Sequence, residues 1–331
     1  MSLSWRLLDS GITEAWNTVA AACPHVTFFQ TKSWADLFCS TFRLWRPATV
    51  AMEFSDGNLM VLPLVRNSVF GSCESMIPHV YGGPMFLRPP DEEHLEAAQL
   101  VPTWYPDVTL LDNPFSPYKR EQDGLARYRL YTQATDLTPG YAALWKQFRK
   151  GHKSDYKAAQ KQGVTVAMAT ALHEVDAYYE IYQDSLRRWG KNANGFYPRR
   201  LFHNLFRMPE YGSGVKLLLA RLDDKIIGGM ITLYHGEHAV SWHGSSHSAY
   251  ISSHPESLLV ISAIESACSE GFRWFDHMGP NDHLKGVRRF KEGFASQTVP
   301  YNAYYSTGSV KGMAFKRYRR FREKYLRRSP F

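Results

Sequence analysis

The sequence predicts an α+β protein of two similar lobes, each a mixed sheet flanked by helices, followed by a basic C-terminal helix. At 331 residues the chain exceeds the size of one ordinary hydrophobic core, which favours two domains. Helical patterns and paired strands follow one another in mixed order, as in α+β proteins. The two halves also overlay when Asp56 is placed on Asp224, an offset of 168 positions. We expect lobes over residues 1–135 and 136–308, and the basic helix over 309–331.

The first lobe is expected to contain amphipathic helices and a hairpin. The turn Ser-Asp-Gly-Asn at residues 55–58 joins two apolar runs, which is a good hairpin signal. Helices are expected over residues 12–22, 28–42 and 91–100, the second of them capped near Thr31 or Ser33. Strands are expected over residues 48–54, 59–66, 108–111 and 127–132.

The second lobe repeats the order of helix and hairpin. A lysine-rich helix ends at Gly163, a residue type that stops helices, and another helix begins at His254-Pro255. Helices are expected over residues 145–162, 174–190, 198–206 and 254–271. Strands are expected over residues 164–169, 215–222, 226–234 and 240–244, with a last one at 274–276. The matched order favours internal duplication over a chance similarity of two helix–hairpin units.

The positive charge is concentrated at the C-terminus. Residues 315–331 carry eight Lys or Arg and one Glu, so they supply +7 of the net charge of +8. Aromatic residues recur at helical spacing in this tail, which predicts a helix. Two interpretations remain open: a helix that docks by its aromatic face, or a platform for phosphates of tRNA, of a nucleotide-linked substrate or of an anionic membrane surface. DNA is not expected as a partner.

Composition and cysteine usage indicate a globular protein of a reducing compartment. Hydrophobic residues make up 44% of the chain. No apolar run reaches the roughly 18 residues of a membrane-spanning helix, and the N-terminus lacks the apolar core of a signal peptide. The four cysteines show no CxxC spacing, so they predict neither a metal framework nor disulfides. We therefore expect a cytoplasmic protein.

The stretch over residues 274–294, WFDHMGPNDHLKGVRRFKEGF, carries the main candidate site. Its strand delivers Asp276 into a turn at Gly279-Pro280, and Lys291 follows between Phe290 and Phe294. This order is suited to placing a carboxylate and a lysine inside an apolar pocket. The simpler interpretation is a strand, a loop and a half-buried amphipathic turn.

Four stretches, taken in order, resemble the Fem family of aminoacyl and peptidyl transferases (FemABX-like). They are Phe29-Gln30 with Trp34, the lysine-rich stretch at residues 153–164, Trp242-His243-Gly244-Ser245, and the Asp276–Gly279 turn followed by Phe-Lys-Glu-Gly-Phe at residues 290–294. The resemblance implies two tandem GNAT-like lobes, with a cleft between them as the natural site for a ligand.

The resemblance also implies roles for single residues. Lys291 falls on the family lysine credited with stabilising the negative charge that develops as the acyl carbonyl is attacked; packing of its stem on aromatic rings is the structural alternative. Asp276 would orient Lys291 or the acceptor amine, or else pair with a backbone turn. Trp242 falls near a family tyrosine that lines the acceptor site. The remaining residues predicted to bind substrate are Phe290, Gly279, His277, Tyr197, Arg199 and Tyr81.

The sequence departs from the family at the positions that grip phosphates in peptidoglycan precursors. Phe38, Tyr197-Pro198 and Leu201 stand where those members have a lysine, an Arg-Pro pair and a tyrosine, although Arg199 and Arg200 lie nearby. This difference predicts a retained transfer chemistry with a changed acceptor. The stretch over residues 249–257, AYISSHPES, also lacks the glycines with which ordinary GNAT enzymes hold coenzyme A, which favours aminoacyl-tRNA or another activated acyl donor.

Histidines suggest a general base more strongly than a metal site. Their HxxH and HxxxH spacings invite a zinc site, but strand alternation sends them to different faces and no ligand set closes, so no metal is predicted. His243 or His277 could take the proton of an attacking amine. Ser245, Ser246 and Cys268 lack the context of a nucleophile, which favours direct transfer.

We therefore predict an acyltransferase that moves an aminoacyl or acyl group to an amine of a metabolite or envelope precursor. Lys291, Asp276 and His243 are its predicted catalytic residues. The donor, aminoacyl-tRNA or acyl-CoA, is a co-substrate, and no tightly bound cofactor is expected. The alternatives are an acyl-CoA N-acyltransferase of envelope polysaccharide or natural-product assembly, and a non-catalytic GNAT-like module that binds RNA or an anionic surface.

Overall fold

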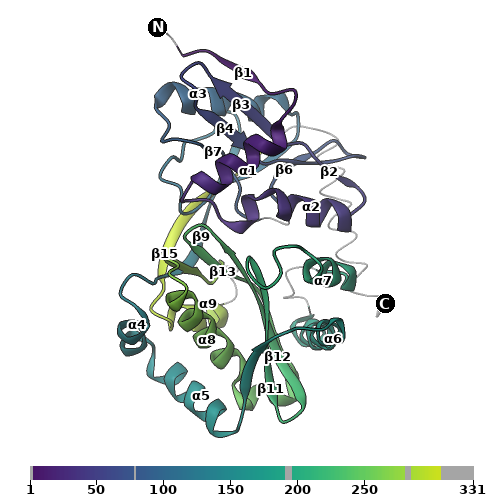
Figure 1. The fold of residues 1–331 in the computed structure, drawn as a ribbon, viewed down its shortest axis with the longest axis vertical. Coiled ribbons are helices and arrows are strands. Elements are labelled where there is room, and N and C mark those ends of the chain that lie inside the picture. The colour runs from purple at the N-terminus through teal and green to yellow at the C-terminus, as the bar shows by residue number, and fades with distance from the viewer. Residues whose placement is uncertain (1–2, 78–79, 191–195, 280–284, 307–331) are drawn as a thin grey trace. The chain divides into compact units, whose positions relative to one another are not determined.

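The computed structural model describes residues 3–77, 80–190, 196–279 and 285–306, and these form two compact units (Figure 1). One unit comprises the chain up to Tyr131 and the strand that returns from Pro300; the other runs from Thr132 to Val299. The predicted lobe boundary at residues 135 and 136 lies inside strand β9 (Ala126–Asp136), which passes from one unit to the other. The predicted basic helix over 309–331 lies outside the described residues.

The first unit contains two sheets. The antiparallel order β1-β3-β4-β7 forms one, and β15-β8-β6-β5-β2 runs through the other. The strands are β1 (Trp5–Leu7), β2 (Trp45–Pro47), β3 (Val50–Phe54), β4 (Leu59–Leu62), β5 (Val65–Asn67), β6 (Cys73–Ser75), β7 (Met85–Phe86), β8 (Val108–Leu111) and β15 (Gln297–Tyr305). The helices are α1 (Ile12–Ala22), η1 (Phe28–Gln30), α2 (Lys32–Thr41), α3 (Glu92–Leu100) and η2 (Val101–Trp104).

The predicted hairpin of this unit is confirmed, since β3 and β4 pair antiparallel with Glu53 opposite Leu59. The predicted helix within residues 28–42, with its cap near Thr31 or Ser33, is confirmed as α2, while residues 28–30 form the separate helix η1. Thr31 has an extended backbone and caps α2, its side chain accepting from the amide of Trp34 at 3.4 Å. The capping residue therefore divides η1 from α2.

The second unit is built on one mixed sheet in the order β10-β11-β12-β13-β14-β9. Its remaining strands are β10 (Thr165–Met168), β11 (Val215–Leu222), β12 (Lys225–His235), β13 (His238–Ser246) and β14 (Trp274–Asp276). Its helices are α4 (Tyr141–Gln147), α5 (Lys150–Lys161), α6 (Leu172–Trp189), α7 (Arg199–Phe206), η4 (Ser248–Ser253), α8 (Pro255–Ser269) and α9 (Lys285–Glu292). The predicted hairpin of β11 and β12 is confirmed.

Helices cover both faces of this sheet (Figure 1). A Cβ added to Gly229 of β12 would lie 2.5 Å from the ring of Tyr178 on α6, so this residue faces α6. The next residue, Met230, belongs to the apolar cluster around α8. Because neighbours in a strand point to opposite faces, α6 lies on one side of the sheet and α8 on the other.

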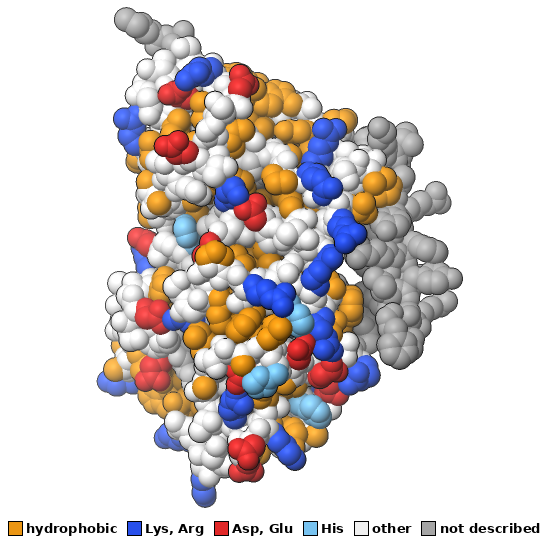
Figure 2. Space-filling model, turned by 45° about the vertical axis from the view of Figure 1, so that its right-hand side comes forward, with side chains coloured by type: hydrophobic (Ala, Val, Ile, Leu, Met, Phe, Trp, Pro, Cys, Tyr) orange, Lys and Arg blue, Asp and Glu red, His pale blue; other side chains and the backbone are white. Residues whose placement is uncertain are grey.

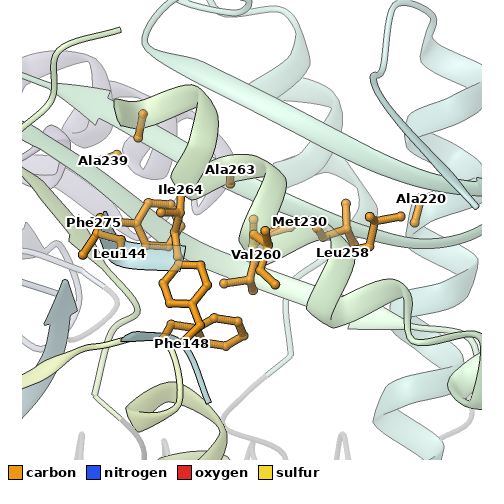
Figure 3. Packing of buried hydrophobic residues seen from close by; sticks show 14 of the residues in the cluster. Leu144, Phe148, Ala220, Met230, Ala239, Leu258, Val260, Ala263, Ile264 and Phe275 are labelled. Carbon is orange, nitrogen blue, oxygen red and sulfur yellow. The ribbon is translucent and has the colours of Figure 1, made fainter. Parts of the chain in front are cut away.

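The core of this unit forms between the sheet and helix α8. Figure 3 shows Val260, Ala263 and Ile264 of α8 together with Phe275 of β14 and Phe148 of the α4–α5 connection. Almost every position of α8 that faces inward is apolar, and the helix links β13 to β14 as a crossover between parallel strands. The burial of these side chains therefore holds β13, α8 and β14 in register.

The prediction of one continuous helix over residues 145–162 is wrong, because the helix is interrupted at Phe148 and Arg149. Phe148 is buried and has an extended backbone, and the amide of Arg149 donates to the carbonyl of Gly293 over 2.8 Å. A tertiary hydrogen bond thus replaces helical bonding at this point, and α4 and α5 are separate helices.

The parallel strands β13 and β14 are paired over a short distance only. Their ladder runs from His238 opposite Trp274 to Val240 opposite Asp276, and β13 continues to Ser246. A register shift opposite Ile231 and Thr232 leaves Trp242 as an extra residue in β13. The end of β14 therefore places Asp276 and the residues after it where the two strands part.

Candidate functional site

Lys291 and Asp276 are joined through one backbone turn at the end of β14. The ammonium of Lys291 donates to the carbonyl oxygen of Met278 over 3.0 Å. Asp276 is fully buried, and its Oδ1 accepts from the amide of Met278 at 2.9 Å and from the hydroxyl of Thr132 at 2.5 Å. This Asx-type turn holds Met278 in the left-handed region with φ 62°. The carboxylate thus shapes the turn whose carbonyl receives the lysine.

The environment of Lys291 suits a cation that acts on developing negative charge. The side chain is half-buried on α9, and burial lowers the pKa of its ammonium to about 8, against the opposing effect of Asp276 and Glu256. A partly desolvated cation interacts more strongly with an oxyanion than one in bulk water. Lys291 therefore remains mostly protonated at neutral pH while having little water around it.

Glu256 contributes a further charge to this site and was not predicted from the sequence. It occupies the first turn of α8, and water reaches its side chain. Desolvation by the surrounding protein nevertheless raises the pKa of its carboxyl, and the cations of Arg188 and Lys291 oppose that rise. Glu256 therefore adds a carboxyl whose charge interacts with that of Lys291.

His277 lies beside this group on the α8 face of the sheet. Its Nε2 is 2.9 Å from the hydroxyl of Thr135, which itself donates to the carbonyl of Phe294 at 2.9 Å. Since the hydroxyl proton is used on Phe294, Nε2 carries the histidine proton and donates. Burial, with contributions from the charges of Lys291 and His152, lowers the pKa of His277 to about 3. It is therefore neutral at physiological pH and a weak base.

Trp242, His243 and Tyr197 form a second group, on the α6 face. The Oη of Tyr178 lies 2.6 Å from His243 Nδ1, and the ring of Tyr197 is 5.4 Å from that of Trp242 and 5.8 Å from that of His243. Burial lowers the pKa of His243 to about 3. The structure places His243 among aromatic rings with its Nδ1 engaged, and none of its described contacts is to Lys291.

The other predicted residues are distributed around the molecule. Arg199 lies over the ring of Tyr179 at 4.9 Å and pairs with Asp176 and Glu180 of α6. Tyr81 is buried in the first unit, where its ring contacts those of Phe29, Phe115 and Tyr301. Phe290 packs edge-on against His152 and Phe294, and Gly279 is the last described residue before the gap at 280–284. The structure therefore unites Lys291, Asp276, His277 and Phe290 but not the whole predicted set.

Two positions that differ from the phosphate-gripping pattern hold core residues. Phe38 is 1% exposed in the first unit, where its ring packs on that of Trp34, and Leu201 is 0% exposed on α7. A buried apolar side chain cannot present a cation or a hydroxyl to a phosphate. The structure thus gives these positions a packing role.

Charged side chains of both signs lie on the described surface. Lys, Arg, Asp and Glu side chains are interspersed on the face that Figure 2 shows. Among the described residues, no three His, Cys, Asp or Glu side chains gather as metal ligands would. No helix in the described ranges is both long enough and apolar enough to cross a bilayer.

Several residues of the site could not be found by local pattern. Thr132, Thr135, His152 and Tyr178 become neighbours of the predicted residues only through sheet pairing and helix packing. The sequence pattern could have indicated Glu256, because it is an acidic residue in the first turn of the helix that was predicted to start at His254-Pro255. Glu256 lies within residues 249–257, the stretch that corresponds to the coenzyme A loop of ordinary GNAT enzymes.

The comparisons support an acyltransferase with a GNAT domain in its second unit. The model of the acetyltransferase (GNAT) domain matches residues 146–292, which contain Glu256, Asp276 and Lys291. The predicted α+β fold, the resemblance in fold to Fem proteins and the acyltransferase class are confirmed. A comparison with curated proteins finds no match.

Solved structures of similar fold share little sequence identity with this chain. FemX has a TM-score of 0.67 at 13% identity, with 90% of this chain and 96% of FemX covered. A domain named as the C-terminal domain of a lysylphosphatidylglycerol synthetase from Agrobacterium fabrum has a TM-score of 0.55 at 13% identity, covering 93% of this chain and 96% of its own. A tandem GNAT protein from the clavulanic acid biosynthesis pathway has a TM-score of 0.52 at 12% identity, covering 93% and 99%. The chain thus has the tandem GNAT fold of these proteins.

Proposed function

We propose that the second unit transfers an aminoacyl or acyl group from an activated donor to an amine by direct attack. The observation that carries this proposal is Lys291, a half-buried cation held on the Met278 carbonyl where β13 and β14 part. The amine nitrogen bonds to the acyl carbon, the carbonyl oxygen becomes an oxyanion, and the bond to the leaving group then breaks. Lys291 stabilises that oxyanion.

The amine must lose a proton during the reaction, and Glu256 is the residue we assign to receive it. Its carboxyl has a raised pKa, is reached by water and interacts with the charge of Lys291. His243 and His277, each with a pKa of about 3, are weaker bases than a general base working near neutral pH requires. Glu256→Gln is expected to lower kcat at neutral pH and to remove an acidic limb from the pH–rate profile, whereas an unchanged profile rejects the assignment.

Aminoacyl-tRNA is the donor we favour. The tandem fold matches FemX over 90% of this chain, and the tail at residues 315–331 carries a charge of +7 that suits an RNA backbone. Residues 249–257 contain no glycine, so the loop that precedes α8 lacks the sequence with which ordinary GNAT enzymes approach the coenzyme A pyrophosphate. Charged tRNA is made in the cytoplasm, which is where the proposal places the reaction.

An acyl-CoA donor is the second candidate, and the match to the acetyltransferase domain favours it. In that case the acceptor amine would belong to an envelope polysaccharide or a natural product under assembly. The buried Phe38 and Leu201 argue against the phosphate grip of peptidoglycan-directed enzymes in either case. The half-buried Trp242 and Tyr197 would line the acceptor by ring contact.

A donor screen with the purified chain tests the proposal. Charged tRNA pools and acyl-CoAs are offered with a panel of amines, and products are read by mass spectrometry. Lys291→Met should abolish transfer, while Lys285→Met at the exposed start of the same helix serves as the matched control. No transfer from either pool would favour a non-catalytic module that binds RNA or an anionic surface. Removing residues 315–331 should weaken tRNA association; unchanged association identifies the tail as a docking helix.

A further inference from the structure

Helix α9 carries Lys291 but has little packing of its own. It is only eight residues long, and none of its side chains is fully buried. A short helix without a buried face gains little stability from propensity alone. The contacts at the C-terminal end of α9, where Phe290 packs on the core cluster, therefore help to fix the position of Lys291.

The C-terminal end of α9 is held by the beginning of α5. His152 Nε2 lies 2.9 Å from the carbonyl oxygen of Phe290, and Arg149 donates from its amide to Gly293 O at 2.8 Å and from its guanidinium to Arg289 O at 2.9 Å. The carbonyls of Arg289 and Phe290 lie in the last turn of α9, and that of Gly293 follows directly after it; Phe290 O also accepts the amide of Gly293 at 3.0 Å. Residues 149–152 thus hydrogen-bond to three carbonyls at and just beyond the end of α9.

Aromatic contacts fix the same junction. The ring of His152 stacks on that of Phe294 at 4.2 Å with an interplanar angle of 5°, and His277 stacks on Phe294 at 5.6 Å and 18°. Phe294 is fully buried, and its carbonyl accepts the hydroxyl of Thr135. Since Thr135 also receives the proton of His277 Nε2, hydrogen bonds run from the residue after Asp276 to the end of α9.

Gly293 shows how closely His152 approaches the chain. A Cβ at this position would lie 2.1 Å from His152 Nε2 and 3.2 Å from the carbonyl oxygen of Phe290. The absence of a side chain at Gly293 is what allows the imidazole to reach that carbonyl. Gly293 of the Phe-Lys-Glu-Gly-Phe motif therefore leaves the space that His152 of the lysine-rich helix occupies.

We propose that His152 is a positioning residue, whose imidazole docks the C-terminal turn of α9 and so holds the ammonium of Lys291 against the carbonyl of Met278. This inference rests on the proposed role of Lys291. His152 does not touch the reacting groups. It acts through Phe290 O, Gly293 and Phe294, and it gives the lysine-rich helix a role in placing the catalytic lysine.

The test measures the position of Lys291 separately from turnover. Trace acylation of the purified full chain across neutral to alkaline pH, followed by peptide mass spectrometry, gives the apparent pKa of Lys291. His152→Phe keeps a flat ring on Phe294 but removes the donor to Phe290 O, and His173→Phe at an exposed site on α6 is the matched control. The labelled pKa should rise from about 8 toward its ordinary value of 10.5 in His152→Phe and stay unchanged in His173→Phe.

Kinetics supply the second measurement. kcat should fall by about 10- to 100-fold in His152→Phe with KM little changed, because small displacements of a catalytic group cost this much. His152→Gln, whose amide can donate to the same carbonyl, should recover part of both kcat and the lowered pKa. A lowered melting temperature with an unchanged Lys291 pKa would overturn the proposal and leave His152 a purely structural residue.

A double-mutant cycle keeps the proposal testable if His152→Phe folds poorly. Gly293→Ala should disturb Lys291 labelling strongly in the natural background and weakly when combined with His152→Ala, which removes the ring that the new methyl group would meet. Effects that simply add in the double variant reject the contact. If the chain shows no transferase activity with any donor, the proposed function is rejected. The labelling results still test whether His152 holds Lys291 in place, so the two proposals can be rejected independently.

Discussion

The ammonium of Lys291 donates to the carbonyl oxygen of Met278 over 3.0 Å, and the amide of Met278 donates to Asp276 over 2.9 Å. One residue therefore connects the cation with the buried carboxylate. The left-handed conformation of Met278 turns its carbonyl and its amide toward these two partners. The site is thus built by backbone geometry as much as by side chains.

Replacing Lys291 by Met should remove transfer without unfolding the protein. Loss of one group that stabilises an oxyanion typically lowers kcat by about 10² to 10³-fold. Lys285→Met, at the exposed first residue of α9, should retain full activity. Steady-state kinetics of the natural protein and the two variants test this prediction, and circular dichroism checks that each is folded. Retained turnover in Lys291→Met excludes the oxyanion role.

The same variant should be more stable than the natural protein at neutral pH. The pKa of Lys291 is lowered to about 8 by burial, so the folded state binds its proton less tightly than the unfolded state does. This difference between the pKa values of the folded and unfolded states lowers the free energy of unfolding below pH 8. The free energy of unfolding rises again as the pH increases from about 8 to 10.5. With an allowance for the partial exposure of the side chain, Lys291→Met should gain about 1–2 kcal/mol in denaturant unfolding. A loss of stability would show that the ammonium is a net structural contact.

The pH–rate profile should distinguish an electrostatic role of Lys291 from a role as base. If the protonated form is active, kcat/KM falls as pH rises through about 8, because the ammonium loses its charge. A lysine that accepts the amine proton would give the opposite slope over the same range. An acceptor whose own amine titrates well below this range keeps its ionisation from obscuring the result.

Gly229 should tolerate no side chain. A Cβ there would lie 2.5 Å and 2.8 Å from two ring carbons of Tyr178, whereas a Cβ at Gly244 in the neighbouring strand meets nothing closer than 3.9 Å. Gly229→Ala should therefore lower the free energy of unfolding by about 1–3 kcal/mol, and Gly244→Ala should have a small effect. Thermal unfolding of both variants compares the two positions. Equal effects would show that the ring of Tyr178 moves aside freely.

Acid should destabilise the protein through its neutral buried histidines. The pKa values of His277 and His243 are both lowered from 6.5 to about 3 by burial. The contribution of the two histidines to the free energy of unfolding is complete above about pH 6.5 and is lost as the pH falls toward 3. The loss is about 1.4 kcal/mol per pH unit for each histidine. His277→Gln should reduce the dependence of the free energy of unfolding on pH, and the dependence that remains should come from His243. His173→Gln, at an exposed site, should leave it unchanged. Chemical denaturation at several acidic pH values measures the slopes.

Local sequence signals predicted most elements because their causes are local. The turn at residues 55–58 and the Asp223-Asp224 turn join hairpins, and the predicted helices over 12–22 and 254–271 match α1 and α8 closely. The failures arose where distant contacts decide. Phe148 leaves the helical path because it is buried in a core whose other members lie far along the chain. Strand β15 was not predicted, and α9 was expected only as a half-buried amphipathic turn.

The sequence by itself determined the α+β class, the order of the two lobes and the candidacy of Lys291 and Asp276, because periodicity, turn residues and an ordered set of motifs are properties of the chain. Only the tertiary structure decided which candidates meet. It joined Lys291 to Asp276 through Met278, placed His243 in an aromatic layer with Tyr178, and added Glu256 and His152. The physical reason is that burial, hydrogen-bond geometry and pKa depend on neighbours in space, and those neighbours come from strands and helices that are remote in the sequence.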